Sequence, residues 1–86
     1  MKELEKILKA FANRRRLAIV KYLKQQSKAT VGEIAREIRL SFKSTSHHLI
    51  ILAFIEVVEK NQVNTQAWYS LKKKQSTVAR RIIDIL

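Results

Sequence analysis

The sequence predicts a mainly α-helical domain of the α+β class, a winged helix-turn-helix of about five helices and one β-hairpin, on three observations. A capped amphipathic helix begins at Thr30, a second helix opens at Ser41 after a short turn, and two strand-forming runs follow, the second ending in Trp68-Tyr69-Ser70-Leu71. Two short helices joined by a tight turn form a helix-turn-helix, and the strand pair adds the wing. This arrangement presents one helix to a nucleic-acid groove.

Two further helices are expected ahead of this unit. Apolar residues recur at helical spacing from Leu4 to Phe11, with lysines between them, so residues 2–11 form an amphipathic first helix. Asn13 is positioned to cap a second helix that ends near Gln26. The residues expected on its inward face are Leu17, Val20 and Leu23, flanked by Ile19 and Tyr22.

The third and fourth helices each begin at a capping residue. Thr30-Val31-Gly32-Glu33 has the capping-box pattern, in which the Thr30 hydroxyl accepts from the Glu33 amide and the Glu33 carboxylate accepts from the Thr30 amide. Ser41 is expected to cap a fourth helix that runs to about Phe54. The residues expected to be buried along this segment are Ile34, Ala35, Ile38, Leu40, Thr45, Leu49 and Leu52.

The wing and a last helix complete the predicted domain. Residues 56–60 and 66–71 are rich in strand formers and are separated by the polar stretch 61–65, which predicts a β-hairpin with Trp68 and Tyr69 as core and strand-pairing residues. Helical spacing returns over residues 73–86. Because no linker or repeat interrupts the chain, residues 1–86 are expected to form a single domain.

The charge of the chain favours a polyanionic partner. Lys and Arg number 18 against 7 Asp and Glu, and the net charge is +11. The isoelectric point near 10.5 exceeds the value of about 9 that suggests nucleic-acid binding. Positive charge also suits anionic membranes and acidic proteins. The distribution favours nucleic acid, because no acidic residue lies between Glu37 and Glu56, the interval that holds the fourth helix.

Several classes of protein are disfavoured by what the sequence lacks. Without cysteine there is no disulfide, thiolate metal site or thiol redox sensor. The N-terminus has no apolar signal core, and the longest apolar run, Leu49 to Ile55, is much shorter than the roughly 20 residues that span a bilayer. These features predict a cytoplasmic protein with no membrane partner.

The outward face of the fourth helix carries the residue types that contact DNA. At about 100° per residue, Lys43, Ser44, His47 and Ile50 turn away from the core. Lysine attracts phosphate, small hydroxyls allow close approach to a groove, and histidine can bond a base edge. In the wing, Gln62 and Asn64, with their neighbours, can bond phosphate or minor-groove acceptors. Such residues face outward in any solvated helix, but the place of the fourth helix after a capped helix and before a wing favours DNA contact. The wing residues are equally compatible with a solvated surface, and Ser41 is first of all a helix cap.

Metal binding and catalysis find no support in the sequence. His47 and His48 are neighbours, and adjacent helical residues point about 100° apart, so the pair is poorly placed to chelate one ion. No carboxylate lies near these histidines in sequence, and no glycine-rich phosphate loop exists. We therefore expect no catalytic residue, no metal site and no cofactor.

The apolar stripes of the first and last helices exceed what one small core can cover. A homodimer would bury them, although both helices could instead fold back over their own core. The residues expected at a dimer interface are Leu4, Ile7, Leu8, Phe11, Val78, Ile82, Ile83 and Leu86.

Four segments of the chain resemble the ArsR/SmtB family of winged-helix transcriptional repressors, with a match that extends over residues 4–71. They are Leu8-Lys9-Ala10-Phe11-Ala12-Asn13-Arg14-Arg15-Arg16-Leu17, Val31-Gly32-Glu33-Ile34-Ala35, Leu40-Ser41 through Leu49, and Trp68-Tyr69-Ser70-Leu71. The resemblance implies a homodimer formed by the first and last helices, residues 2–11 and 73–86, with the fourth helix in the DNA major groove. Carried over by position, it implies that Ser44, Ser46 and His47 read bases and that Ser41, Lys43 and His48 lie near the backbone.

The chain departs from this family at informative positions. Thr30-Val31-Gly32 stands where metal sensors of the family carry a Cys-Val-Cys motif, and Asp84 in the last helix has no histidine near it. Both familiar metal sites are therefore missing, so that any effector is expected to be a small molecule or a partner protein. Ile50 replaces a residue that is often lysine, and Glu56 replaces a common glycine.

Together these features predict a homodimeric, sequence-specific regulator of transcription, a repressor that binds an inverted repeat in double-stranded DNA. One alternative is a non-specific architectural DNA-binding protein, favoured by the high charge. Another is a winged-helix module that binds a protein through Leu49 to Ile55 or the end helices, favoured by the outward Ile50.

Overall fold

A computed structural model describes residues 2–86, which fold into five helices and a three-stranded antiparallel sheet with strand order β1-β3-β2. The elements are α1 (Lys2–Phe11), α2 (Arg14–Gln26), β1 (Ala29–Thr30), α3 (Val31–Ile38), α4 (Phe42–Phe54), β2 (Val58–Val63), β3 (Gln66–Leu71) and α5 (Thr77–Ile85). The predicted winged helix-turn-helix is confirmed. Met1, the first residue of the expected domain, lies outside the described residues.

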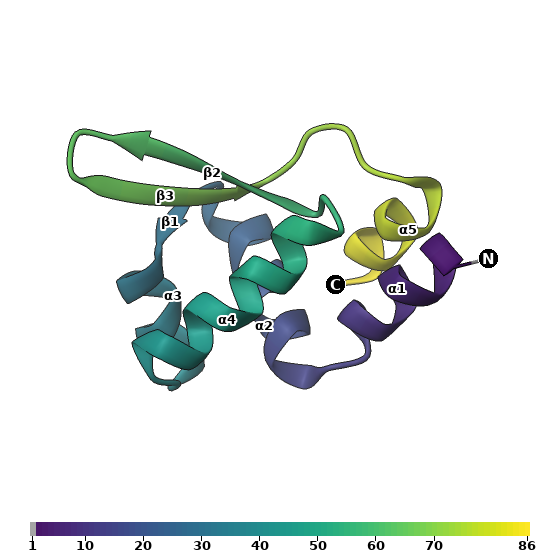
Figure 1. Cartoon of the computed structure of the whole chain (residues 1–86), viewed down its shortest axis with the longest axis horizontal. Helices are drawn as coiled ribbons and strands as arrows, with labels where there is room; N and C mark the ends of the chain where they lie inside the picture. The colour runs from purple at the N-terminus through teal and green to yellow at the C-terminus, as the bar shows by residue number, and fades with distance from the viewer. Residues whose placement is uncertain (1) are drawn as a thin grey trace.

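Figure 1 shows how these elements position the helix-turn-helix and its flanking surfaces. Helix α4 crosses the front of the molecule, and the β2–β3 hairpin projects away from the body at one end (Figure 1). At the other end α1 and α5 lie side by side, in direct contact. Among the helices of residues 2–86, none combines the length and the apolar character that a bilayer-spanning helix needs.

The predicted capping residues Asn13 and Thr30 are found at the starts of α2 and α3. The Asn13 side chain accepts from the amides of Arg15 and Arg16 at 2.9 and 3.0 Å. The Thr30 hydroxyl accepts from the Glu33 amide at 3.2 Å, and the Glu33 carboxylate accepts from the Thr30 amide at 2.9 Å, which confirms the capping box. Each bond satisfies an amide that the helix itself leaves without a partner.

The first strand of the wing begins later and runs further than its composition predicts. Glu56 and Val57 lie before β2, which extends through the polar stretch to Val63 and pairs there with Gln66. Ladder bonds come from the backbone, so exposed polar residues can pair as well as apolar ones. The remaining turn is only Asn64-Thr65, and Asn64 adopts a left-handed φ of 57°, which asparagine tolerates better than most residues. Strand β1, too short to have a sequence pattern, was not predicted.

The last helix is shorter than expected because its start is fixed by side-chain bonds. It begins at Thr77 instead of residue 73, with the Ser76 hydroxyl accepting from the Ala79 amide at 3.2 Å. The Gln75 side-chain amide donates to the carbonyls of Val57 and Lys72 at 2.9 and 2.7 Å. These bonds hold the segment between β3 and α5 in a non-helical path.

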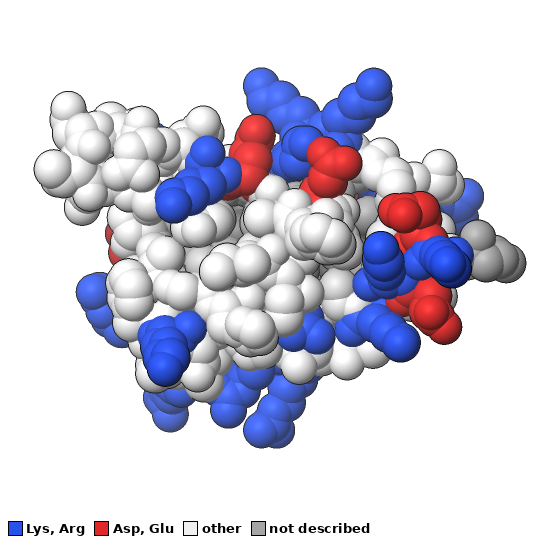
Figure 2. All heavy atoms as spheres, in the orientation of Figure 1, with Lys and Arg blue, Asp and Glu red and all other residues white. Residues whose placement is uncertain are grey.

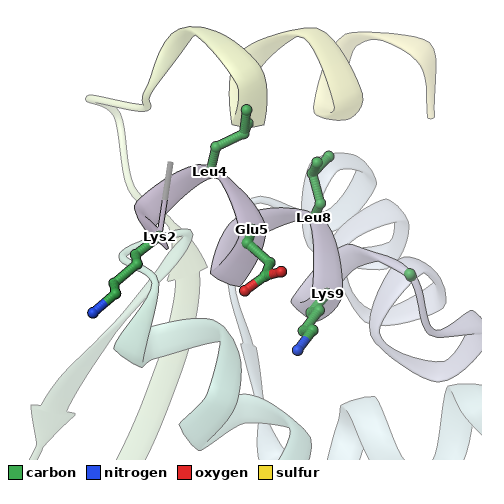
Figure 3. A pocket seen from close by; sticks show the side chains of 6 residues that line it. Lys2, Leu4, Glu5, Leu8 and Lys9 are labelled. Atoms are coloured by element: carbon green, nitrogen blue, oxygen red, sulfur yellow. The ribbon is translucent and has the colours of Figure 1, made fainter.

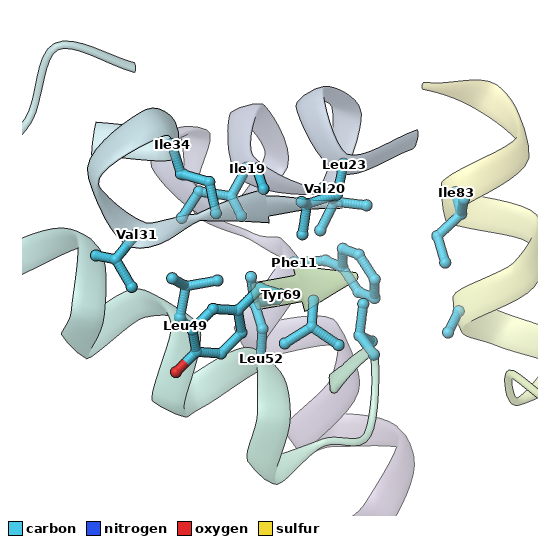
Figure 4. Close-up of a cluster of buried hydrophobic side chains, with 14 residues drawn as sticks. Phe11, Ile19, Val20, Leu23, Val31, Ile34, Leu49, Leu52, Tyr69 and Ile83 are labelled. Atoms are coloured by element: carbon cyan, nitrogen blue, oxygen red, sulfur yellow. The ribbon is translucent and has the colours of Figure 1, made fainter. Parts of the chain in front are cut away.

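Fourteen side chains from all parts of the fold form the core (Figure 4). Helix α2 is the centre, in contact with α1, α3, α4, α5 and β3. Contact on so many sides widens its buried face, so Ile19, expected at the flank, is fully buried, while Leu17 is only half-buried. Ile38 and Leu40 are also half-buried, because the turn between α3 and α4 lies at the edge of the core.

Thr45 is the one buried polar residue among residues 2–86, and it makes a stability prediction possible. Its side chain is 0% exposed, and its hydroxyl has no hydrogen-bond partner within the described chain. Because an unpaired buried hydroxyl costs free energy, Thr45→Val is expected to raise the free energy of unfolding by about 1 kcal/mol. Urea denaturation followed by circular dichroism measures the change. Thr45→Ser keeps the hydroxyl and removes a methyl group, and a variant as stable as Thr45→Val would contradict the explanation.

Candidate nucleic-acid interface

Helix α4 presents a polar stripe because its opposite face is anchored in the core. Leu49 and Leu52 are fully buried with Thr45, which fixes the rotation of the helix about its axis. Lys43, Ser44 and His47 consequently lie on the exposed side, as the helical spacing predicts. Ser46 is half-buried at the flank of the stripe.

Ser41 serves as the cap of α4 and keeps a free proton. Its hydroxyl oxygen accepts from the Ser44 amide at 3.1 Å. A hydroxyl that accepts with its oxygen can still donate its hydrogen. Ser41 can therefore cap the helix and also bond an anion that approaches the first turn of α4.

His48, unlike the exposed His47, is tied to another helix. Arg16 of α2 places its Nη1 3.0 Å from Nδ1 of His48, and its Nε donates to the carbonyl of Ala10 at 2.6 Å. Guanidinium nitrogens only donate, so the Nδ1 atom of His48 must accept. A neutral His48 then carries its proton on Nε2. Arg16 thus links the end of α1 to the helix that carries the polar stripe.

Arg16 is a residue of the candidate site that the sequence does not point to. It belongs to the run Arg14-Arg15-Arg16, which the sequence shows only as local positive charge. Its partner lies 32 positions away, on a different helix. Helical periodicity describes one element at a time, so it contains no signal for this pairing.

The surroundings of His48 oppose its protonation. Partial burial lowers the pKa of His48, and the positive charge of Arg16 lowers it further. His47 and Arg15 act in the same direction, more weakly. The accepting role of Nδ1 agrees with this shift, because a protonated ring would have no lone pair for Arg16.

The lowered pKa of His48 predicts a loss of stability in mild acid. With the folded pKa below the ordinary value of about 6.5, the unfolded state binds the proton more readily. The contribution is complete above about pH 6.5 and is lost as the pH falls through the folded pKa. Denaturation midpoints measured between about pH 7.5 and about pH 5 should therefore fall more for the parent than for His48→Asn, which keeps an acceptor near Nδ1 and does not titrate. Equal pH dependence of the two proteins would contradict this role of His48.

The wing adds uncharged polar groups at a distance from α4. Gln62 lies in β2 and Asn64 in the turn that follows, both exposed. Asn64 has a structural role as well, since its left-handed backbone closes the two-residue turn. The projecting hairpin is almost entirely white in Figure 2, so its tip offers amide and hydroxyl groups and few charges.

Positive charge gathers along one border of the face that displays α4. In Figure 2 the lower edge of the molecule, beneath α4 and α2, contains Lys and Arg and no acidic residue among those described. The acidic residues visible in this view lie near the start of the wing, around α1 and at the left edge below the projecting hairpin. An anion approaching the lower edge therefore meets cations without an intervening carboxylate.

The expected dimer residues divide into two groups. Phe11 and Ile83 are 4% and 2% exposed and belong to the core of the chain itself. Leu8 is 47% exposed, and the others are half-buried: Leu4, Ile7, Val78, Ile82 and Leu86. Figure 3 shows Leu4 and Leu8 on one side of α1, with Lys2 and Lys9 directed to the other. These residues line an open groove of about 540 Å³.

The histidines of α4 form no metal site with neighbouring ligands. Their ring centroids are 6.1 Å apart and tilted by 56°. Within residues 2–86 there is no group of three or more histidine, aspartate or glutamate side chains that could hold a metal ion.

The chain is similar to a known protein family in sequence and to solved structures in fold. A family described as "Bacterial regulatory protein, arsR family" matches residues 13–60. No curated protein sequence matches the chain.

Solved structures match over nearly the whole chain. Reduced HlyU from Vibrio cholerae is 30% identical with a TM-score of 0.82, and the match covers 99% of this chain and 85% of HlyU. NolR from Sinorhizobium fredii is 27% identical with a TM-score of 0.83, covering 98% and 80% of the two chains. The homodimeric winged helix-turn-helix DNA-binding domain of Mb0332 from Mycobacterium bovis is 27% identical with a TM-score of 0.82, covering 98% and 75%.

Proposed function

Because the chain belongs to the arsR family of bacterial regulatory proteins, we propose that it is a homodimeric transcriptional repressor that binds an inverted-repeat operator sequence-specifically. The family consists of DNA-binding transcriptional regulators and not of enzymes. The observation that carries the proposal is the stripe of Lys43, Ser44 and His47, exposed on a helix whose other face is locked into the core.

The residues of α4 have complementary roles in this proposal. Ser44 and His47 read base edges in the major groove, with Ser46 at the flank of the stripe. Lys43 attracts phosphate, and the Ser41 hydroxyl donates to it beside the free amides of the first helical turn. His48 is held by Arg16 and offers its Nε2 proton to the DNA backbone.

The wing extends the contact beyond the major groove. Gln62 and Asn64 bond phosphate oxygens or the acceptors of the minor-groove floor. Since the wing tip carries little charge, its contribution is expected to depend on hydrogen bonds more than on salt.

A two-fold dimer would pair two such surfaces. The proposed interface is formed by α1 and α5, which lie within residues 2–11 and 73–86. It consists of the exposed Leu8 and the half-buried residues Leu4, Ile7, Val78, Ile82 and Leu86. Phe11 and Ile83 are left out, because the chain's own core already covers them. Two recognition helices related by two-fold symmetry fit successive major grooves about 34 Å apart, which requires an inverted repeat. The homodimeric state of the Mb0332 domain supports this arrangement.

Selection from a random DNA library tests operator binding and its symmetry together. The purified protein, at a stated salt concentration, is expected to enrich an inverted repeat whose half-sites are about one helical turn apart. Binding without any enriched sequence, with an affinity that depends steeply on salt, would instead favour a non-specific architectural role.

A further inference from the structure

A second surface on α4, beyond its polar stripe, is apolar and exposed. Ile50 and Phe54, in the C-terminal half of the helix, are 63% and 75% exposed. With the half-buried Ile51 they form the floor of a groove of about 440 Å³. Such a group of large apolar side chains in water is typical of an interaction site.

The walls of this groove are basic. Lys6 and Lys9 reach it from α1 and Arg16 from α2, and no aspartate or glutamate lines it. The Nζ atom of Lys6 lies 5.7 Å from the centre of the Phe54 ring, a cation–π distance. In Figure 2 the white surface over α4 has Lys and Arg below it, and a mixture of basic and acidic residues lies to one side, around α1. We call this surface, formed by Ile50, Ile51, Phe54, Lys6, Lys9 and Arg16, the basic-rimmed groove.

Two simple occupants fit the groove poorly. DNA supplies phosphates for the rim, but the small thymine methyl groups of its major groove would cover little of two side chains as large as Ile50 and Phe54. A second copy of the chain is already assigned, in the proposed dimer, to the opposite side of α1, where Leu4 and Leu8 point away from Lys9. The occupant must combine apolar side chains with negative charge.

We propose that the basic-rimmed groove binds a short amphipathic helix of a partner protein, with apolar side chains on one face and Asp or Glu beside them. Apolar anchors at helical spacing would lie on Ile50 and Phe54, while flanking carboxylates would pair with the lysines and with Arg16. An open groove between helices suits a helical peptide, because its backbone bonds are already satisfied internally.

Arg16 connects the groove with the DNA-reading helix. The same guanidinium that faces the groove donates to His48 and to the Ala10 carbonyl. A carboxylate bound to Arg16 would compete with Nδ1 of His48 for this donor. Occupation of the groove is therefore expected to change the proton affinity of His48, whether or not DNA is present.

A designed peptide tests the proposal directly. The probe is a fluorescent helical peptide of about 16 residues, with Leu and Phe on one face and Glu on the others. A scrambled peptide of identical composition is the control. The designed peptide is expected to bind the whole protein at least roughly tenfold more tightly than the scrambled one, with an affinity that falls as salt is added.

Variants of the groove locate the binding site. Ile50→Ser with Phe54→Ser should weaken the designed peptide roughly tenfold or more, whereas Val63→Ser, an exposed apolar residue of the wing, should have no effect. Lys6→Glu with Lys9→Glu should weaken it and reduce the salt dependence. All these side chains are exposed, so thermal unfolding should report intact folds. A histidine NMR titration should show an altered pKa for His48 when the peptide is bound.

Three results would overturn the proposal. They are equal binding of the two peptides, unchanged affinity of the Ile50→Ser, Phe54→Ser variant, and conversion of a dimer into monomers by that variant, which would assign the groove to a second copy. Because no DNA enters these measurements, they can fail while the proposed operator binding stands, and the reverse is also possible.

Discussion

Lys43→Ala combined with His47→Ala is expected to weaken operator binding by at least roughly 30-fold. Each lost base or phosphate contact costs about 1–3 kcal/mol, and every 1.4 kcal/mol is a factor of ten in affinity. Both side chains are exposed on α4, so the fold should remain intact. Fluorescence anisotropy with the selected operator, at several salt concentrations, measures the loss.

The two single variants should differ in kind. Lys43→Ala should weaken operator and unrelated DNA alike and lower the dependence of affinity on salt, because lysine meets phosphate. His47→Ala should mainly reduce the preference for the operator. Lys21→Ala, which removes an exposed charge from α2 instead of α4, is the matched control. A double variant that binds the operator like the parent would contradict the assignment of α4 as the reading helix.

Much of the fold could be predicted because its determinants are local. A capping box at Thr30 and a serine cap at Ser41 fix the starts of α3 and α4 through bonds within four residues. The spacing of Thr45, Leu49 and Leu52 fixes the rotation of α4. The family resemblance rests on the same segments, so fold and family were both predictable.

The errors occur where distant contacts decide the structure. Strand β2 is longer than its apolar run because β3 pairs with its polar residues, and α5 starts late because Gln75 bonds to Val57 and Lys72. Phe11 and Ile83 have the same spacing as their exposed neighbours, yet they pack into the core. Helical periodicity indicates which face of a helix is apolar, but it does not indicate which neighbour will cover that face.

Glu56, one of the departures from the family pattern, forms an ion pair with Lys72. Glu56 follows α4 at a position where the family commonly has glycine, and its φ is 61°, the left-handed region that favours glycine. Its carboxylate pairs with Lys72 at 2.9 Å, across the base of the wing. This pair lowers the pKa of Glu56 and raises that of Lys72. The helix still ends at Phe54, so the departure does not extend or displace α4.

The surface of α4 is divided along its length. Its first half carries the polar stripe beside the exposed Phe42, and its second half carries Ile50 and Phe54. Arg16 touches both halves, through His48 and through the basic-rimmed groove. Through Arg16, a protein bound at the groove would alter DNA binding by the polar stripe. Residues 2–86 contain no thiol and no metal cluster that could serve as another sensor.

Leu8→Glu is expected to separate the proposed dimer into monomers and, through this, to abolish tight operator binding. Leu8 is the most exposed of the proposed interface residues, so the substitution leaves the core of the chain intact. Two-fold symmetry would bring two unpaired carboxylates into one apolar contact. Their desolvation should cost at least about 3 kcal/mol, which weakens dimerisation more than roughly a hundredfold.

Sedimentation velocity at micromolar concentration measures this effect, and Val63→Glu, the same chemical change at an exposed position of the wing, is its control. The parent and Val63→Glu should sediment as dimers and Leu8→Glu as a monomer. A monomer offers one recognition helix, so it should bind a full operator no more tightly than a half-site. If Leu8→Glu remained dimeric, the interface would have to lie away from the exposed side of α1. If the parent itself were monomeric, α1 and α5 would only complete the core of their own chain, and the inverted repeat would lose its physical basis.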